Sequence, residues 1–167
     1  MSHLQHKATA PLSVHCVVVT VSDTRTEATD TGGRAIVDLL TAAGHTVAAK
    51  VIVKDDPEMV RDMMALHLAQ PHVQAIITTG GTGISSRDST YEAISGLLDK
   101  RLDGFGELFR MISYQQIGAS AMLSRACAGI AGGRIVVALP GSEAAVRLAL
   151  ETLIIPELGH LVREASR

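Results

Sequence analysis

The chain has 167 residues, of which 47% are hydrophobic, and its formal net charge at pH 7 is −2. This length predicts one domain, with enough apolar residues to form a core without disulfides or metals. The near balance of charge argues against nucleic acid or a membrane surface as the partner. No apolar run reaches the length of a membrane span, and the polar first ten residues carry no secretory signal, so we expect a cytoplasmic protein. Residues 1–12 are expected to form a flexible tail ahead of a single domain over residues 13–167.

The first half of the chain alternates between β-branched apolar runs and helical patterns. Apolar residues at helical spacing predict a helix over residues 34–43, which ends at Gly44, and a second helix that begins after Asp56-Pro57 and stops before Pro71. Short aliphatic runs predict three strands, at residues 14–21, 47–53 and 73–79. A β-α-β-α-β order requires parallel strands that are joined by right-handed helical crossovers.

The second half of the chain is predicted to contain shorter elements. Ser89 and Glu92 form a capping-box signature for a helix over residues 91–98, and residues 104–113 predict another short helix. A long helix with an apolar stripe is expected over residues 143–162.

Two short apolar runs, residues 126–131 and 135–139, flank Gly132-Gly133. The glycine pair is typical of a hairpin, so one antiparallel strand is expected at the edge of the sheet. Together the elements predict an α/β fold with a mostly parallel sheet, which suits a core built from aliphatic side chains.

The strongest functional signal is a glycine-rich turn directly after the third predicted strand, Gly80-Gly81-Thr82-Gly83. Glycines permit backbone angles that are closed to other residues and let a ligand approach the main chain. Successive N–H groups in such a turn can form an anion-binding nest, with hydroxyl donors beside it. The turn matches neither a Walker A loop nor the dinucleotide fingerprint, and its structural alternative is a tight turn without a ligand. The predicted ligand-binding residues here are Thr79, Gly80, Gly81, Thr82, Gly83 and Ser85.

Two acidic positions are candidates to hold Mg²⁺ next to a bound phosphate. Asp88 precedes the helix predicted at residues 91–98, and Asp55 follows the second predicted strand. Mg²⁺ prefers carboxylate oxygens, usually one or two, with substrate oxygens and water completing its shell. Asp56 is the expected N-cap of a helix, so Asp55 is the better candidate of that pair. The alternative role of Asp88 is to stabilise a helix N-terminus through the helix dipole.

Two further turns at predicted strand ends are candidate anion sites. Gly141 and Ser142 precede the last predicted helix, whose unsatisfied N–H groups favour an anion, although Ser142 would cap that helix in any case. Ser22 and Asp30, in the loop over residues 22–33, are a weaker signal because they could instead form Asx-type turns.

The cysteines, histidines and methionines show no sign of a metal or disulfide framework. Cys16 and Cys127 lie in apolar runs and are expected to be buried thiols. The seven histidines lack metal-ligand spacing. Three methionines at helical spacing are expected in the core: Met59, Met63 and Met64.

Five segments of the chain form a specific set of motifs. They are VTVSDTR with DTGG between residues 19 and 33, VKDD at 53–56, TTGGTGISSRDSTYEAI at 78–94, GFGELFR at 104–110, and LPGSEAAV at 139–146. In content and order these segments resemble the MoaB/Mog family of molybdenum cofactor biosynthesis. The resemblance runs from about residue 14 to the C-terminus. The GFGE-FR form and the chain length are closer to MoaB than to Mog.

The resemblance implies a three-layer α/β molybdopterin-binding fold and an enzyme that uses Mg-ATP to adenylylate molybdopterin. The adenylylated pterin is then the substrate for metal insertion, and pyrophosphate is released. By their place in the family's motifs, Asp55 and Asp88 would act in catalysis and hold Mg²⁺, and Ser142 belongs to a ligand-binding turn. Glu107 and Arg110 fall in the GFGE segment and are further ligand-binding candidates.

The resemblance also implies a homo-trimer or homo-hexamer and contacts with other proteins of the pathway. A second interpretation is a non-catalytic molybdopterin-binding or scaffold protein, because some MoaB proteins lack the transferase role where Mog is present. The presence of both Asp55 and Asp88 favours activity. A third interpretation, a receiver-type phosphorylation domain, conflicts with the third predicted strand, which ends in Thr79-Gly80 rather than in an aspartate.

Overall fold

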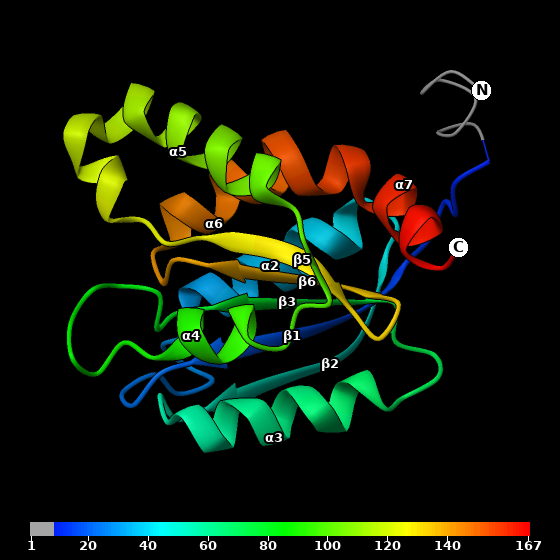
Figure 1. Ribbon diagram of the computed structural model, residues 1–167, viewed down its shortest axis with the longest axis horizontal. Helices are drawn as coiled ribbons and strands as arrows, with labels where there is room; N and C mark the ends of the chain where they lie inside the picture. Colours follow the sequence, from blue (N-terminus) through cyan, green and yellow to red (C-terminus); the bar gives the residue numbers. More distant parts are fainter. Residues whose placement is uncertain (1–8) are drawn as a thin grey trace.

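The computed structural model describes residues 9–167, in which a six-stranded sheet forms the centre of the molecule (Figure 1). The strands are β1 (His15–Val21), β2 (Thr46–Val53), β3 (Ala75–Thr79), β4 (Lys100–Arg101), β5 (Cys127–Ala131) and β6 (Arg134–Leu139). Their order across the sheet is β2-β1-β3-β6-β5-β4. β1, β2, β3 and β6 run parallel, whereas β5 is antiparallel to β6 and β4 is antiparallel to β5.

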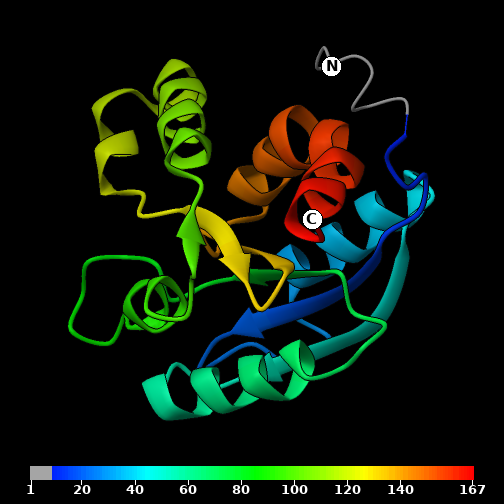
Figure 2. The same cartoon turned by 45° about the vertical axis from the view of Figure 1, so that its right-hand side comes forward.

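Helices cover both faces of this sheet and complete three layers (Figure 2). They are α2 (Thr31–Ala42), α3 (Pro57–Leu68), α4 (Thr90–Ser95), α5 (Asp103–Ile117), α6 (Glu143–Ala149) and α7 (Ile155–Ala165), with a 3-10 turn at Gly118–Leu123 and a π-helical turn at Leu150–Ile154. α2, α5, α6 and α7 lie on one face, and α3 and α4 lie on the other. No helix within the described residues is long and apolar enough to cross a membrane.

The core is aliphatic on both faces of the central strands. All of β1 from Cys16 to Val21 is buried. Val18 packs in the cluster that contains α2 and α6, whereas Val17 and Val19 pack in the cluster that contains α3 and α4. Successive side chains of a strand point to opposite faces, so a strand covered on both sides reads as the continuous apolar run seen in this sequence.

The predicted fold class is confirmed, with two differences at the antiparallel end of the sheet. Gly132 and Gly133 form the predicted hairpin turn, with φ angles of 54° and 75°. The strand β5, which this hairpin makes antiparallel, lies inside the sheet rather than at its edge. The edge strand at this end of the sheet is β4, which was not predicted because two residues are too short to show any periodicity.

Three helices differ from their predicted form. α5 continues to Ile117, beyond its predicted end. α4 is shorter than residues 91–98, and the capping box is wrong because Ser89 Oγ donates to Asp55 Oδ1 at 3.0 Å instead of capping the helix. The long last helix is interrupted by the π-helical turn, since Pro156 has no N–H to continue the α-helical pattern there.

The cysteine prediction is confirmed, and the methionine prediction is partly wrong. Cys16 and Cys127 are buried free thiols, and burial raises the pKa of Cys16 to about 12. Met64 is fully buried, but Met59 is 46% exposed on the outer side of α3. The tail expected over residues 1–12 lies for the most part outside the described residues.

α2 begins earlier than predicted, so Gly32 and Gly33 belong to its first turn rather than to a loop. The buried Asp30 carboxylate caps the helix by accepting the Gly33 N–H at 2.9 Å. It also accepts from the Thr20 hydroxyl at 2.7 Å and pairs with Lys50 Nζ at 2.9 Å. A Cβ at Gly33 would collide with Asp30 and Thr20, so only glycine fits beside this carboxylate.

The Asp30 carboxylate should make stability depend on pH. Burial raises the pKa of the Asp30 carboxyl, but the hydrogen bonds from Lys50 and its other partners outweigh burial and bring the pKa below its ordinary value. A lowered carboxyl pKa stabilises the fold above the unfolded-state pKa, and this contribution is lost as the pH falls through the folded-state value. We therefore expect Asp30→Asn to lower the free energy of unfolding at neutral pH by about 2 kcal/mol.

The difference between the wild type and Asp30→Asn should shrink below about pH 4. Urea denaturation at neutral and acidic pH measures it. Asp38→Asn, an exposed change on the same helix, is the matched control and should have little effect at either pH. A loss of stability that stays equal at both pH values would show that the charge of Asp30 is not responsible.

Candidate functional site

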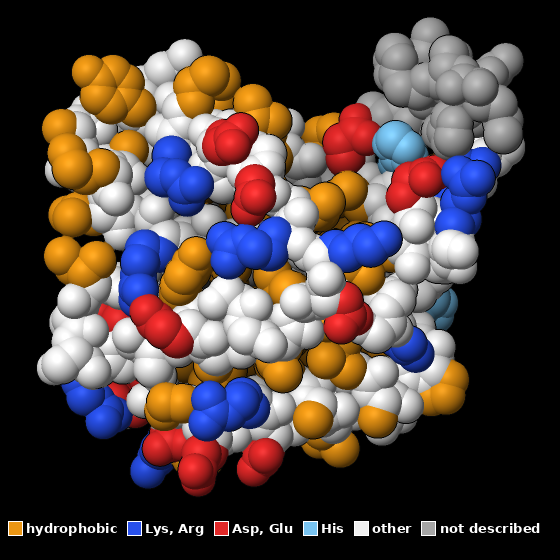
Figure 3. Space-filling model, in the orientation of Figure 1, with side chains coloured by type: hydrophobic (Ala, Val, Ile, Leu, Met, Phe, Trp, Pro, Cys, Tyr) orange, Lys and Arg blue, Asp and Glu red, His pale blue; other side chains and the backbone are white. Residues whose placement is uncertain are grey.

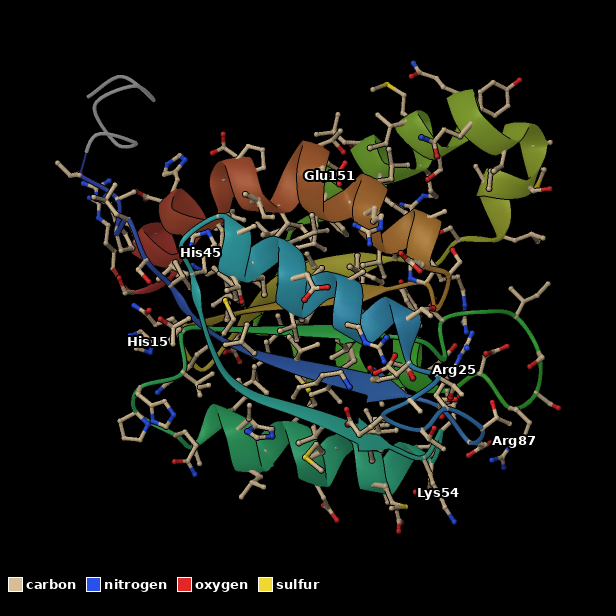
Figure 4. The ribbon with its side chains drawn as sticks, turned by 180° about the vertical axis from the view of Figure 1, so that it is seen from behind. His15, Arg25, His45, Lys54, Arg87 and Glu151 are labelled. Atoms are coloured by element: carbon tan, nitrogen blue, oxygen red, sulfur yellow. The ribbon has the colours of Figure 1, made fainter. Side chains whose placement is uncertain are left out.

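The carboxyl ends of β1, β2, β3 and β6 meet at one edge of the sheet, where ligands bind in open α/β folds. The Gly80 N–H donates to the Leu139 carbonyl oxygen at 3.0 Å, which joins the loop after β3 to the end of β6. Figure 4 shows three basic side chains at this end of the molecule: Arg25, Lys54 and Arg87.

The glycine-rich turn after β3 needs glycine for reasons that involve no ligand. Gly80 and Gly81 have φ angles of 97° and 67°, which other residues rarely adopt. A Cβ at Gly80 would collide with the carbonyl oxygen of Val21, and a Cβ at Gly81 would collide with the Thr90 side chain. The turn is therefore packed tightly between the end of β1 and the start of α4.

Four consecutive amides of this turn donate no hydrogen bond to the protein. They belong to Gly81, Thr82, Gly83 and Ile84, and none has an acceptor within residues 9–167. Thr82 is buried, and its two glycine neighbours are half-buried. Amides removed from water are costly unless another group accepts from them, and a row of such amides attracts an anion.

A pocket of about 420 Å³ borders the turn. One wall is polar and consists of the turn, Asp88 and the loop that follows β6. A second wall comes from α5 and the segment after it, and three of its five residues are apolar. The residues of this second wall are Phe109, Ser113, Ile117, Leu123 and Ser124. A pocket that combines polar groups with apolar side chains is typical of a site for a ring compound that carries a charged group.

The two carboxylates predicted to hold Mg²⁺ flank the turn. Asp88 Oδ2 accepts from the Ser85 amide at 2.9 Å and from the Ser85 hydroxyl at 2.6 Å. Asp55 Oδ1 accepts from the Ser89 hydroxyl at 3.0 Å. Asp55 Oδ2 would lie 2.8 Å from a Cβ at Gly81, so this carboxylate is directly beside the turn. Both carboxylates thus hold the loop in shape through hydrogen bonds and also add negative charge to it.

The free carboxylate oxygens of the site suit a Mg²⁺ ion whose coordination shell is completed by substrate oxygens and water. Asp55 Oδ2 and Asp88 Oδ1 accept no hydrogen bond from the described part of the chain, so each carboxylate keeps one oxygen for an ion. Mg²⁺ commonly binds one or two carboxylates together with phosphate oxygens and water. No cluster of three or more His, Cys, Asp or Glu residues that could hold a metal occurs among residues 9–167, so an ion here would depend on the substrate.

Gly141 and Ser142, the predicted anion-binding residues after β6, border the same pocket. Ser142 Oγ accepts the Ala145 N–H at 3.3 Å, so its hydroxyl also caps α6. A Cβ at Gly141 would lie 3.4 Å from the Gly80 Cα, so the loops after β3 and β6 are in close contact. The structure therefore brings together the turn, Asp88 and the loop before α6.

Besides the GFGE pair, five predicted ligand-binding residues do not line this pocket: Gly80 and Ser85 of the turn and its flank, and Thr79, Ser22 and Asp30. The buried Thr79 hydroxyl donates to the Pro140 carbonyl oxygen at 2.8 Å and joins β3 to the loop after β6. Ser22 Oγ accepts the Arg25 N–H at 3.0 Å in a local turn, which is the role predicted as the alternative to ligand binding. Asp30 is buried at the start of α2. We give these residues structural roles, and their contacts with a ligand stay predictions.

The two candidates from the GFGE segment also lie away from the pocket. Glu107 is exposed on α5. Arg110 donates to the carbonyl oxygens of Ala126 at 3.2 Å and Ser124 at 3.4 Å, which ties α5 to the segment before β5. Phe109, between them in the same segment, was not singled out from the sequence, although it is the residue of this segment that borders the pocket.

An ion pair across two loops of the site was also not predicted. Arg87 Nη2 lies 2.5 Å from Asp23 Oδ2, and this hydrogen bond lowers the pKa of the Asp23 carboxyl. The two residues are far apart in sequence, so only the shared edge of parallel strands brings them together. The pair links the loop after β1 to the loop that contains Asp88.

A family model described as a probable molybdopterin binding domain matches residues 17–160 of this chain. The chain belongs to the MoaB/Mog family of molybdenum cofactor biosynthesis proteins. Molybdenum cofactor biosynthesis protein B of Bacillus cereus is 52% identical to this MoaB/Mog chain, over all of this chain and 99% of the relative.

Solved structures of the MoaB/Mog family agree with the fold. A crystal structure of molybdenum cofactor biosynthesis protein B is 52% identical, with a TM-score of 0.90 over 94% of this chain and 98% of that one. The tungsten cofactor synthesizing protein MoaB from Pyrococcus furiosus is 39% identical, with a TM-score of 0.82 over 95% of this chain and all of the other. This member of the MoaB/Mog family therefore has the three-layer fold that the sequence motifs implied.

Proposed function

We propose that this chain adenylylates molybdopterin in a reaction that needs Mg-ATP and releases pyrophosphate. The observation that carries the proposal is the row of four amides from Gly81 to Ile84, which have no acceptor within residues 9–167 and lie beside a pocket and between two carboxylates. Both substrates carry phosphate groups that such amides would bind. Membership of the MoaB/Mog family, whose model describes molybdopterin binding, supports the identity of the pterin.

The proposed chemistry is a nucleotidyl transfer. A terminal phosphate oxygen of molybdopterin attacks the α-phosphorus of ATP and forms a new P–O bond. The bond from the α-phosphorus to the oxygen that bridges to the β-phosphorus breaks, and its electron pair leaves with pyrophosphate. Such transfers are catalysed mainly by positioning and by neutralisation of charge, and both are tasks that amides and fixed carboxylates can perform.

The residues of the site divide these tasks. The amides from Gly81 to Ile84 would hold one phosphate, and Ser142, which borders the same pocket at the start of α6, would bind a second one. Asp55 and Asp88 would hold Mg²⁺ through their free oxygens, and the ion supplies positive charge next to the transferred phosphate. The wall that contains Phe109 suits the face of an adenine or pterin ring.

The alternative is a molybdopterin-binding protein without transferase activity. The observation that favours it is that both carboxylates already accept hydrogen bonds from serines of the loop, so they could serve only to shape a binding site. Such a protein would bind the pterin and leave ATP unchanged.

Transfer from ATP labelled in its α-phosphate tests the proposal. Purified protein is incubated with molybdopterin, Mg²⁺ and the labelled ATP, with reactions that lack each component in turn as controls. We expect label in the pterin product and an equal amount of pyrophosphate. Binding of molybdopterin with all label remaining in ATP would contradict transfer and support the alternative.

The exposed surface supports self-association, which we also propose as a trimer or hexamer on the basis of the family resemblance. Large hydrophobic side chains gather on α5 and the 3-10 turn, at the upper left of Figure 3. They are Leu108, Met111, Tyr114, Ile117, Met122 and Leu123. Exposed apolar patches mark interaction sites. The molar mass from light scattering tests this proposal, and a monomer would contradict it.

A further inference from the structure

Arg125 lies between the 3-10 turn and β5, where it contacts the glycine-rich turn without bordering the pocket. Its Nε donates to the Thr82 carbonyl oxygen at 3.1 Å. Its Nη2 donates to the Gly83 carbonyl oxygen and, at 3.5 Å, to that of Asp88. One side chain therefore holds three carbonyl groups of the loop that carries the proposed anion site.

Two of these contacts orient the amides of the turn. The C=O and N–H of a trans peptide point in opposite directions, and the chain has no cis peptide among its described residues. When the Thr82 and Gly83 carbonyls face Arg125, the amides of Gly83 and Ile84 must therefore face away from it. These are two of the four amides that lack an acceptor in the described part of the chain.

The third contact, with the Asp88 carbonyl, orients an amide that donates to the proposed metal ligand Asp55. The Asp88 carbonyl faces Arg125, so the amide of Ser89 faces the other way, and it donates to Asp55 Oδ1 at 3.4 Å. The Arg125 guanidinium therefore orients both the amides of the turn and the amide that donates to the Asp55 carboxylate. Its positive charge attracts the carbonyl oxygens of these peptides, so their N–H groups point toward the proposed ligand.

Arg125 is itself held by the helix that follows the loop. Its Nη1 pairs with Glu92 Oε1, and Nη2 lies 3.4 Å from Glu92 Oε2. The guanidinium also lies over the Tyr91 ring, 5.0 Å from the ring centroid. Only the planar fork of arginine can serve several carbonyls, a carboxylate and an aromatic face at once, because lysine has a single nitrogen.

We propose that Arg125 is a positioning residue that holds the glycine-rich turn in its anion-binding form, with Glu92 and Tyr91 holding Arg125 in place. The identity of the anion as a substrate phosphate rests on the proposed function. The positioning role concerns anion binding alone, so it can be tested separately from transfer.

Binding of inorganic pyrophosphate to the full chain, measured by calorimetry, tests the role. We expect Arg125→Met to raise the dissociation constant about 10- to 100-fold, as the loss of hydrogen bonds from a charged group implies. Arg125→Lys keeps the charge but not the fork, and should weaken binding nearly as much. Glu92→Gln keeps hydrogen-bonding atoms but removes the ion pair, and should have a smaller effect in the same direction.

The matched control is Arg134→Met at the opposite end of β6. Arg134 also holds backbone carbonyls, those of Gly132 at 2.6 Å and Gln70 at 3.5 Å, but among the described residues it makes no hydrogen bond to Gly80–Gly83. This variant should lose thermal stability to a similar degree and keep the wild-type affinity for pyrophosphate. The comparison separates a specific effect on the turn from a general loss of stability.

Wild-type affinity in folded Arg125→Met or Arg125→Lys would overturn the proposal, and so would equal weakening by Arg134→Met. If the wild type binds no pyrophosphate, the turn is not an anion site and the positioning role fails with it. If the wild type binds pyrophosphate, the Arg125 variants bind it weakly and no adenylylated pterin forms, then the proposed function fails while the role of Arg125 stands.

Discussion

Replacement of Asp88 by asparagine should reduce adenylyl transfer at least about a hundredfold and leave the fold intact. An asparagine side chain still offers an oxygen to the Ser85 N–H, so the loop can keep its shape. It lacks the negative charge that Mg²⁺ binding requires. The transfer of α-phosphate label at saturating ATP and Mg²⁺ measures the effect, and circular dichroism measures the fold.

Asp62→Asn is the matched control for this change. Asp62 is exposed on α3, and its carboxylate has no hydrogen bond or ion pair within the described residues, so the variant removes the same charge away from the site. It should transfer label at the wild-type rate. Wild-type transfer by Asp88→Asn itself would remove Asp88 from the proposed metal site and leave it with the structural role that its contacts with Ser85 already show.

Gly80→Ala should lower the free energy of unfolding by about 3 kcal/mol and abolish anion binding. The φ angle of Gly80 is 97°, and a Cβ there would collide with the Val21 carbonyl oxygen, which is backbone of a central strand and cannot move aside. Urea denaturation measures the first effect, and calorimetry with pyrophosphate measures the second.

Gly44→Ala is the control that separates the collision at Gly80 from the free-energy cost of a positive φ angle. Gly44 has a similar φ of 87°, but a Cβ there would have nothing within 4 Å. Its replacement should therefore cost only about 1 kcal/mol, the price of the left-handed conformation for a residue with a side chain. Equal costs at Gly44 and Gly80 would mean that the end of β1 relaxes around the new methyl group.

Most of the fold could be predicted because its signals are local. The apolar run that forms β1 and the alternation of strands with helices required a parallel sheet, and Gly132-Gly133 marked the hairpin. The errors lie where contacts distant in sequence decide the outcome. β4 is a strand only because it pairs with β5, and Ser89 does not cap α4 because Asp55 takes its hydroxyl.

The candidate site could be predicted only in part for the same reason. The glycines from Gly80 to Gly83 are adjacent in the sequence, and Asp55 comes close to them because parallel strands end at one edge. Arg125 follows Thr82 by 43 residues, and a single arginine in a connecting segment has no pattern that would reveal its contacts. Thr79 lies in the same glycine-rich motif, and the motif did not reveal that its buried hydroxyl donates to the Pro140 carbonyl oxygen. Its contact with a ligand stays a prediction.

The central claim is that the amides from Gly81 to Ile84 bind a substrate phosphate. A crystal structure of the wild type with molybdopterin, Mg²⁺ and an ATP analogue tests it most directly. The analogue carries a methylene group in place of the α,β-bridging oxygen, so that transfer is blocked. We predict phosphate oxygens of one substrate at about 3 Å from these amide nitrogens. A structure in which both substrates are bound, every phosphate lies elsewhere and the turn contacts only water would contradict the claim.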